Sequence, residues 1–297
     1  MNGTPLIQRL LADGPVLTDG AWGTQLQSRG LSAGEFPDLW NLTHPEKVAD
    51  VARAYVNAGS RVILTNTFGA NRIRLQEAGL ADRVAAINEA GARLSREAAG
   101  NRAFVFASLG PTGKTLLAGD VTPEEISEAF REQAKALARG GADALVVETM
   151  SDLEEAKRAI AATKQTGLPV VACMVFDSGK EKDRTMMGTT PEAAAAGLVA
   201  AGADVVGANC GQGIAGFVKI CARLRSAAAG RPVWIKANAG LPELRDGTPF
   251  YPTTAAEFAS FVPALLDAGA NFVGGCCGTS PEFIRAIRQT LNKPAPR

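Results

Sequence analysis

Eight short apolar runs recur along the chain, and longer amphipathic stretches separate them. Each run consists mostly of Val, Ile, Leu, Ala and Phe without alternating polar residues, which is typical of parallel strands that are covered on both faces. Eight strands are the number that a closed (β/α)8 barrel requires. The runs span residues 16–21, 61–68, 104–111, 144–150, 169–176, 205–210, 233–238 and 272–277.

Helix signals lie between these runs. Four segments have the spacing of a capping box, in which a hydroxyl and a carboxylate three residues later satisfy free amides at a helix N-terminus. Glycines stand just before four of the runs, where glycine can end a helix. One βα unit is therefore used repeatedly, with capping segments at 43–46, 122–125, 151–154 and 254–257 and helix-ending glycines at Gly59, Gly140, Gly141, Gly202 and Gly269.

This succession predicts an α/β fold, a single (β/α)8 TIM barrel, over residues 1–297. No linker rich in Pro, Ser or Gly divides the chain, and barrels of roughly 250 residues commonly form one domain. An open doubly wound sheet would use similar strands and helices, and it is the alternative fold at this stage.

The composition of the chain argues against several classes of function. The 31 basic and 30 acidic side chains give a formal net charge of +1, so no field exists that would concentrate nucleic acid or an anionic membrane. The first 14 residues contain only a short apolar patch, which is neither a signal-peptide core nor a membrane span. We therefore expect a cytoplasmic protein that acts on small molecules and binds neither nucleic acid nor membrane. Five cysteines, an odd number, favour metal or thiol chemistry over a disulfide framework.

Three of these cysteines lie where apolar runs end. Cys210 ends the sixth run, and Cys276 and Cys277 end the eighth within Gly-Gly-Cys-Cys-Gly. The C-terminal ends of barrel strands form the active-site face, and one strand separates the sixth from the eighth. Three converging thiolates with one open position suit catalytic zinc, so we predict these three as zinc ligands. The alternative is that they are buried fillers, the role that we assign to Cys173 and Cys221.

Such a zinc ion favours chemistry at a sulfur atom. Three thiolates make zinc a poor Lewis acid, yet it can still deprotonate a fourth, exchangeable thiol and keep that sulfur nucleophilic. The single histidine, His44, rules out a His-rich site for hydrolysis. A G-x-G-x-x-G pattern at 211–216 lacks an acidic residue about twenty positions on, where Lys236 and its neighbours stand, so we expect no dinucleotide cofactor.

Six short motifs follow one another at the run ends: Asp19-Gly20-Ala21-Trp22-Gly23-Thr24, Thr65-Asn66-Thr67-Phe68, Gly110-Pro111-Thr112-Gly113, Glu148-Thr149, Asn209-Cys210-Gly211 and Gly274-Gly275-Cys276-Cys277-Gly278-Thr279. With them the chain resembles, nearly end to end, the homocysteine S-methyltransferase family. That family includes betaine-homocysteine and S-methylmethionine-homocysteine methyltransferases and the homocysteine module of cobalamin-dependent methionine synthase. The resemblance implies zinc-dependent transfer of a methyl group from a small donor to the homocysteine thiolate, giving methionine.

The resemblance also implies roles for individual residues. Cys210, Cys276 and Cys277 match the zinc ligands, and Asn238 matches a residue that can occupy the fourth position before homocysteine arrives.

The same resemblance implies how the amino-acid part of homocysteine is held. Glu148 would hold the homocysteine ammonium with help from Asp19, since opposite charges attract. Backbone amides near Gly20 and Ala21 would receive its carboxylate.

The methyl donor stays open at this stage. Betaine, S-methylmethionine or a similar small molecule is one possibility, although three Trp and two Tyr make an aromatic cage for a quaternary ammonium sparse. Trp22 and Trp40 are candidates for its walls, and a core role suits them equally. The alternative is a homocysteine-activating component that takes the methyl group from a separate methylcorrinoid protein, since no folate or cobalamin module is recognisable. A third interpretation is a barrel enzyme of other chemistry with structural zinc.

Overall fold

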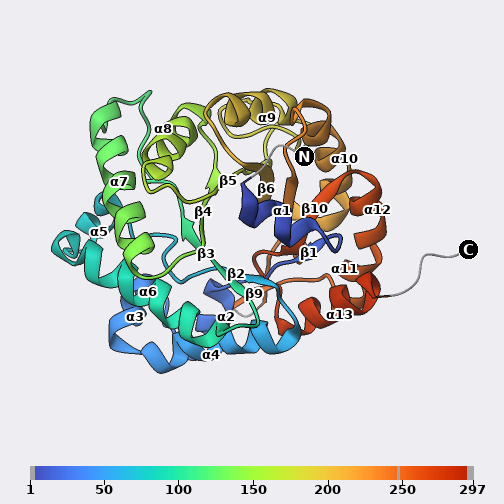
Figure 1. Cartoon of the computed structure of the whole chain (residues 1–297), viewed down its shortest axis with the longest axis horizontal. Helices are drawn as coiled ribbons and strands as arrows, with labels where there is room; N and C mark the ends of the chain where they lie inside the picture. Colours follow the sequence, from blue (N-terminus) through green and yellow to red (C-terminus); the bar gives the residue numbers. More distant parts are fainter. Residues whose placement is uncertain (1–3, 246–247, 293–297) are drawn as a thin grey trace, which may run out of the picture.

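The computed structural model describes residues 4–245 and 248–292. Its strands form one eight-stranded parallel sheet in the order β1-β10-β7-β6-β5-β4-β3-β2, and the sheet curls into a ring inside a layer of helices (Figure 1). The Arg61 amide donates to the Leu17 carbonyl, 2.8 Å away, across the gap between the first and last strands. The predicted (β/α)8 barrel is thus confirmed, and the open doubly wound sheet is excluded. The strands are β1 (Val16–Leu17), β2 (Val62–Ile63), β3 (Phe104–Leu109), β4 (Ala144–Met150), β5 (Val170–Met174), β6 (Val205–Gly213), β7 (Val233–Asn238) and β10 (Ala270–Gly275).

The first two strands are shorter than the apolar runs at 16–21 and 61–68 predict, because side chains replace ladder bonds at their C-terminal ends. The Leu64 amide donates to the Asp19 carboxylate at 2.7 Å. The Ser108 amide donates to the Thr65 hydroxyl at 3.0 Å. Polar side chains thus hold the barrel together at the end where a barrel enzyme carries its active site.

The helices, in chain order, are α1 (Pro5–Leu11), α2 (Gly23–Gln27), η1 (Pro37–Leu39), α3 (Trp40–Thr43), α4 (Pro45–Ala58), α5 (Arg72–Glu77), η2 (Ala81–Arg83), α6 (Val84–Ala99), α7 (Pro123–Arg139), α8 (Leu153–Lys164), α9 (Pro191–Ala200), α10 (Ile214–Ala227), α11 (Ala255–Ser260), α12 (Val262–Asp267) and α13 (Pro281–Leu291). A short antiparallel hairpin, β8 (Glu243–Arg245) and β9 (Thr248–Phe250), follows β7 and was not predicted. None of the described helices is long and apolar enough to cross a membrane.

Two of the four predicted helix starts are confirmed as capping sites. Thr122 caps α7 in a complete capping box, and Thr254 caps α11 by accepting from the Glu257 amide. The other two predictions are wrong by one residue. Thr43 is still the last residue of α3, so His44 precedes α4, and Asp152 rather than Ser151 caps α8. Left-handed glycines follow four helices at Gly59, Gly141, Gly202 and Gly269.

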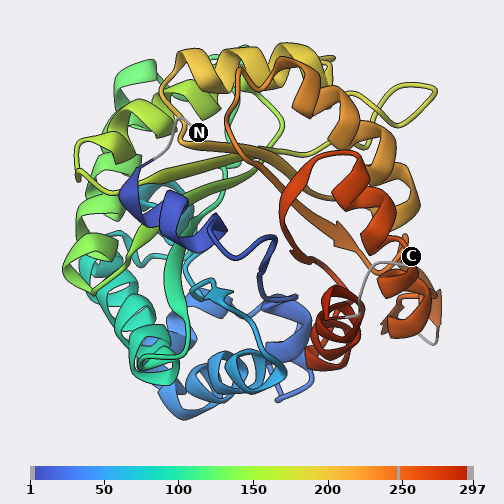
Figure 2. The same ribbon diagram turned by 45° about the vertical axis from the view of Figure 1, so that its right-hand side comes forward.

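The inside of the barrel is filled by a cluster of buried apolar side chains. The Trp234 ring lies 6.0 Å from that of Phe106 and 5.2 Å from that of Phe272, between ring centroids. Ile7 and Leu10 of α1 belong to the same cluster, and α1 lies across one end of the ring (Figures 1 and 2). Helix α1 therefore closes that end of the barrel.

The close contact between β6 and β7 depends on Gly207, where a Cβ would lie 2.1 Å from the Trp234 carbonyl oxygen. We expect Gly207→Ala to force the two strands apart and to lower the free energy of unfolding by about 1–3 kcal/mol, the usual cost of overpacking. Urea unfolding measures the change. Gly23→Ala is the matched control, because nothing lies within 4 Å of its added Cβ. An unchanged midpoint for Gly207→Ala would contradict this packing.

Candidate metal centre

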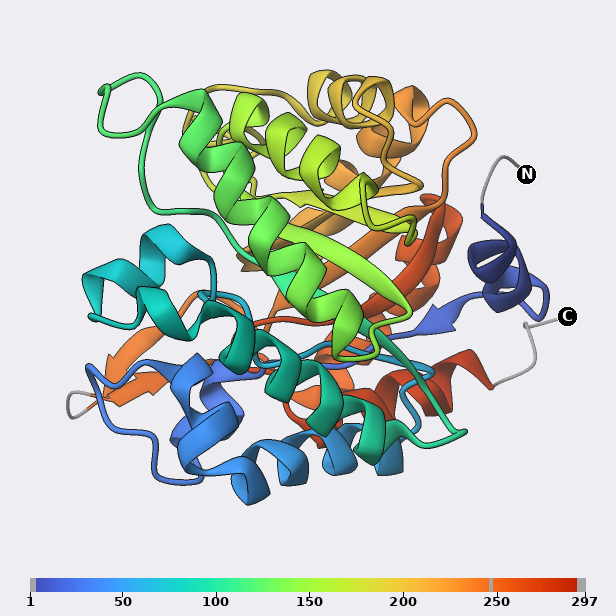
Figure 3. The same ribbon diagram turned by 60° about the vertical axis from the view of Figure 1, so that its left-hand side comes forward.

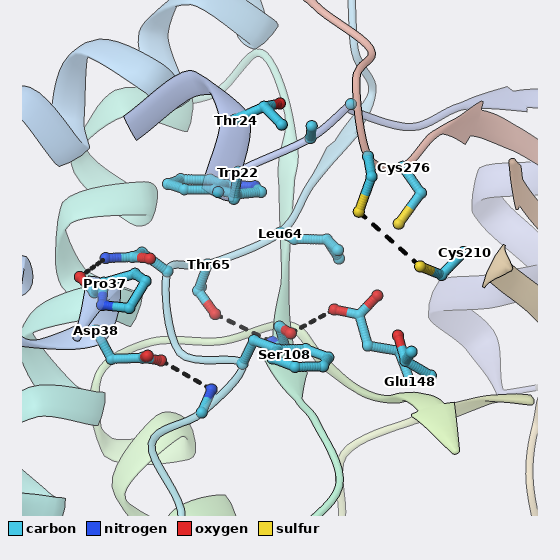
Figure 4. Close-up of a pocket in the computed structure, with 18 of the residues that line it drawn as sticks. Trp22, Thr24, Pro37, Asp38, Leu64, Thr65, Ser108, Glu148, Cys210 and Cys276 are labelled. Atoms are coloured by element: carbon cyan, nitrogen blue, oxygen red, sulfur yellow. Dashed lines mark hydrogen bonds between the residues drawn. The ribbon is translucent and has the colours of Figure 1, made fainter. Parts of the chain in front are cut away.

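The ends of β6 and β10 bring three thiols together, and Figure 4 shows Cys210 and Cys276 pointing into the same part of a pocket. The Cys210 and Cys277 sulfurs are 3.9 Å apart, and all three sulfurs lie within 4.8 Å of one another. A tetrahedral zinc ion with bonds of about 2.3 Å holds two sulfurs about 3.8 Å apart. The three cysteines singled out from the sequence therefore have the spacing that such an ion requires.

The backbone around these thiols is held in uncommon conformations. Cys210 and Thr149 both adopt left-handed φ angles, of 61° and 60°, which cost roughly 1–3 kcal/mol each when surrounding contacts enforce them. For Thr149 the Asn209 side chain supplies those contacts, because its oxygen accepts from the Thr149 amide at 2.8 Å and its nitrogen donates to the Thr149 hydroxyl at 2.6 Å. These bonds tie the end of β4 to the end of β6.

Two glycines next to Cys276 and Cys277, Gly275 and Gly278, let other side chains approach the backbone of this segment closely. A Cβ on Gly275 would lie 2.3 Å from the Thr279 hydroxyl oxygen. Gly278 has a left-handed φ of 79°, and a Cβ there would lie 2.2 Å from the Tyr251 ring. The Gly-Gly-Cys-Cys-Gly segment thus makes room for Thr279 and Tyr251 beside the thiols.

Three thiols this close cannot all lose their protons side by side. Hydrogen bonds from Cys276 and Cys277 lower the pKa of Cys210, and the same contacts raise the pKa of Cys276 and of Cys277 above that of an ordinary thiol. A divalent cation between the sulfurs would remove this repulsion and stabilise the thiolates. Within the described residues, 4–245 and 248–292, these cysteines form the only such cluster of three or more His, Cys, Asp or Glu side chains.

Asn238, at the end of β7, contacts the cluster directly. Its side-chain oxygen accepts from the Cys277 amide at 3.0 Å, and its hydrogen bond to Cys210 helps to lower the pKa of that thiol. The side chain is 5% exposed. Asn238 therefore lies beside the sulfurs, in contact with Cys210 and Cys277.

A cavity of about 510 Å³ opens beside the thiols. We call the part that holds the cysteines, Glu148, Ser108 and Lys236 its inner part, and the part that holds Trp22, Phe36, Asp38, Phe68 and Arg74 its outer part. Figure 4 shows Glu148 and Ser108 lying between the sulfurs on one side and Trp22, Pro37 and Asp38 on the other.

Glu148 is a buried carboxylate in the inner part of this cavity. It accepts hydrogen bonds from the Ser108 hydroxyl and from the Asn209 amide nitrogen, which is 3.2 Å away. Burial raises the pKa of Glu148 to about 7, and the positive charge of Lys236 offsets part of this effect. A cationic group of a ligand would favour the ionised form, so the site is suited to an ammonium.

Asp19 is also buried, but it does not line the cavity. One carboxylate oxygen pairs with the Lys236 ammonium. The other accepts from the Trp22 indole nitrogen at 2.8 Å and from the Leu64 amide at 2.7 Å. The protein itself therefore supplies the partners of Asp19.

Gly20 and Ala21, whose backbone amides the resemblance expects to receive the homocysteine carboxylate, line the cavity. The Ala21 amide, however, already donates to the Thr279 hydroxyl at 3.1 Å.

Several other candidates lie outside the cavity lining. Cys173 and Cys221 are fully buried in the two main apolar clusters, as predicted. Trp40 is 3% exposed and packs on the ring of His44, 4.5 Å away between centroids, and neither lines the cavity.

Sequence reasoning missed Lys236, Asn209 and the outer wall with Phe36 and Asp38. Lys236 did carry a signal, because a lone charge inside the apolar run 233–238 must be paired when that run is a buried strand.

Comparisons with known proteins relate the chain to methyltransferases. A family model described as homocysteine S-methyltransferase matches residues 16–291. The chain is 31% identical to methionine synthase of Mycobacterium leprae over 296 residues, which cover 93% of the chain and 24% of that protein. It is also 31% identical to betaine-homocysteine S-methyltransferase 1 of Danio rerio, covering 97% of the chain and 75% of that protein. The chain thus spans about a quarter of the length of the curated methionine synthases that it matches.

Among solved structures, the metallated form of the homocysteine methyltransferase MmuM from Escherichia coli has a similar fold. The TM-score is 0.78 at 23% sequence identity, over 95% of this chain and 99% of that one. At this identity the likeness concerns the fold.

Removal of one thiol should abolish metal binding at this centre. We expect Cys276→Ser, loaded with Zn²⁺ and dialysed, to retain little metal, because only two of the three thiolate ligands remain. Mass spectrometry of the metal content measures the loss. Cys173→Ala is the control, since that thiol lies inside the barrel core and its loss should leave the metal content unchanged. Full retention of zinc by Cys276→Ser would show that this cysteine is not a ligand.

Proposed function

The chain belongs to the homocysteine S-methyltransferase family, and we propose that it transfers a methyl group to homocysteine with the help of zinc held by Cys210, Cys276 and Cys277. The product would be methionine. The observation that carries the proposal is the convergence of three thiols at the inner end of a cavity that also contains a buried carboxylate, Glu148. Sulfur ligands favour zinc over magnesium or calcium, which prefer oxygen.

Zinc held by the three cysteines would lower the pKa of the incoming homocysteine thiol, so that its proton is released to solvent and its sulfur stays nucleophilic near neutral pH. The chain's own residues would orient the rest of the substrate. Glu148 would receive the ammonium in a charge-assisted hydrogen bond, and Ser108 and Asn209, which already donate to Glu148, would fix the direction of its carboxylate. The methyl donor would occupy the outer part of the cavity.

The outer part of the cavity is suited to a positively charged donor. Betaine and S-methylmethionine carry their positive charge at the methylated atom, and cations of this type bind to aromatic faces. Trp22, Phe36 and Phe68 line this part together with Asp38. The Asp38 carboxylate accepts from the Gly69 amide at 3.0 Å, and burial raises its pKa to about 7, so a cationic donor would favour its ionised form.

A second candidate function has a separate observation in its favour. All the exposed large apolar side chains of the described residues lie in segments that follow barrel strands, either in loops or in the β8–β9 hairpin, at the end of the barrel where the cavity opens. Figure 3 shows loop 113–121 and the β8–β9 hairpin at this end, opposite α1. Apolar surface of this kind often marks protein-binding sites, which supports a methylcorrinoid protein as the donor. The side chains are Phe68, Leu117, Met186, Met187, Leu241, Leu244 and Phe250.

A donor screen tests the proposal and separates the two candidates. Zinc-loaded protein is incubated with homocysteine and, in separate reactions, betaine, S-methylmethionine or methylcobalamin, and methionine is detected by mass. Methionine from betaine or S-methylmethionine supports the small-donor function. Methionine from methylcobalamin alone supports the corrinoid function, and no product with any of the three would contradict methyl transfer to homocysteine.

Loss of the Glu148 charge should weaken homocysteine binding and leave the metal in place. A hydrogen bond to a charged group contributes about 1.5–3 kcal/mol, so Glu148→Gln should raise the dissociation constant by roughly tenfold to a hundredfold. Calorimetry on zinc-loaded protein measures it. Glu35→Gln, an exposed carboxyl group of the outer cavity, is the control. Wild-type affinity in Glu148→Gln would remove Glu148 from the site.

A further inference from the structure

Lys236 is a charged side chain in the middle of a buried barrel strand. It projects from β7, its side chain is 2% exposed, and it lines the inner part of the cavity. Burial of an ammonium is costly unless the group is paired and hydrogen-bonded. Asp19 pairs with it, but neither the resemblance nor the mechanism above gives Lys236 a role.

The hydrogen bonds of Lys236 are incomplete without a ligand. An ammonium has three N–H donors, and the Asp19 carboxylate is the one acceptor that Lys236 has among residues 4–245 and 248–292. Asp19 is in turn fixed by Trp22 and by the Leu64 amide. Asp19 therefore holds the ammonium in place and leaves N–H groups for a further acceptor.

The charges of the inner cavity match those of an amino acid. Glu148 offers a carboxylate and Lys236 an ammonium on the same inner wall, and the two are close enough that Lys236 lowers the pKa of Glu148. An amino acid carries an ammonium and a carboxylate on one carbon atom. The Ala21 amide, expected from the sequence resemblance to bind that carboxylate, is engaged with Thr279.

We propose that Lys236 binds the α-carboxylate of the amino-acid thiol substrate and that Asp19 is the positioning residue that holds its ammonium. This inference rests on the proposed function, because it takes the substrate to be homocysteine. The alternative role is structural, in which Lys236 serves only as a counter-charge for Asp19 and for the nearby sulfur of Cys276.

The affinities of two ligands for the wild-type protein and for variants of Lys236 distinguish these roles. Homocysteine and 3-aminopropane-1-thiol share the thiol and the ammonium, and only homocysteine has the carboxylate. Calorimetry gives the affinity of each thiol for zinc-loaded wild-type protein and for Lys236→Met. We expect wild type to prefer homocysteine by roughly tenfold to a hundredfold, the effect of one charge-assisted hydrogen bond. We expect Lys236→Met to lose this preference and Lys236→Arg to recover part of it.

Lys236→Met leaves the buried Asp19 carboxylate without a counter-charge. The double variant Asp19→Asn/Lys236→Met is therefore measured in parallel, with metal content and circular dichroism as checks on folding. This double variant should also bind both thiols with equal affinity. If Lys236→Met and the double variant weaken the binding of both thiols by the same factor and keep the preference for homocysteine, Lys236 does not contact the carboxylate and the inference is overturned. If wild type binds neither thiol, the proposed function fails and this inference fails with it.

Discussion

The site depends on the parallel register of three neighbouring strands. Lys236 of β7 is aligned with Asn209 of β6 on one side and with Gly274 of β10 on the other. Cys210 lies one residue beyond this aligned level and Cys276 two residues beyond it, and the left-handed backbone at Cys210, with a φ of 61°, changes the course of the chain where its thiol emerges. A slip of one residue in either ladder would turn the side chains to the opposite face. The thiol cluster therefore depends on strand pairing together with the local conformation of Cys210.

Toward the C-terminal ends of the strands, hydrogen bonds of buried polar side chains replace the pairing of backbone groups. Asp19 links β1 to the chain beyond β2 and to Lys236, and Asn209 links the end of β6 to that of β4. A buried charge or amide that loses its partner costs more than the bond itself contributes. The buried polar pairs at the rim of the barrel therefore also make the rim rigid. Rigidity suits a site that has to hold several groups at fixed distances.

The sequence predicted the parts of this arrangement that follow from local pattern. Eight apolar runs identify the barrel, and a strand end is visible from the run that precedes it, so the three cysteines could be placed on one rim. The pairing of Asp19 with Lys236 joins residues 217 positions apart, and no local pattern encodes it. The outer wall was missed because Phe36 and Asp38 come from the segment between α2 and α3, where only the short helix η1 interrupts the loop. The helix start at Ser151 was misplaced because the neighbouring Asp152 also satisfies the capping rule and caps α8. The start at Thr43 was misplaced because α3 extends through Thr43, and His44, whose side chain makes no capping bond, precedes α4.

Helix α1 seals the barrel opposite the thiols, with Ile7 and Leu10 in the interior cluster. The cavity therefore opens at the end of the barrel where the strands finish, away from α1. If the amino-acid thiol and the donor bind as proposed, both would enter, and both products would leave, through this one end.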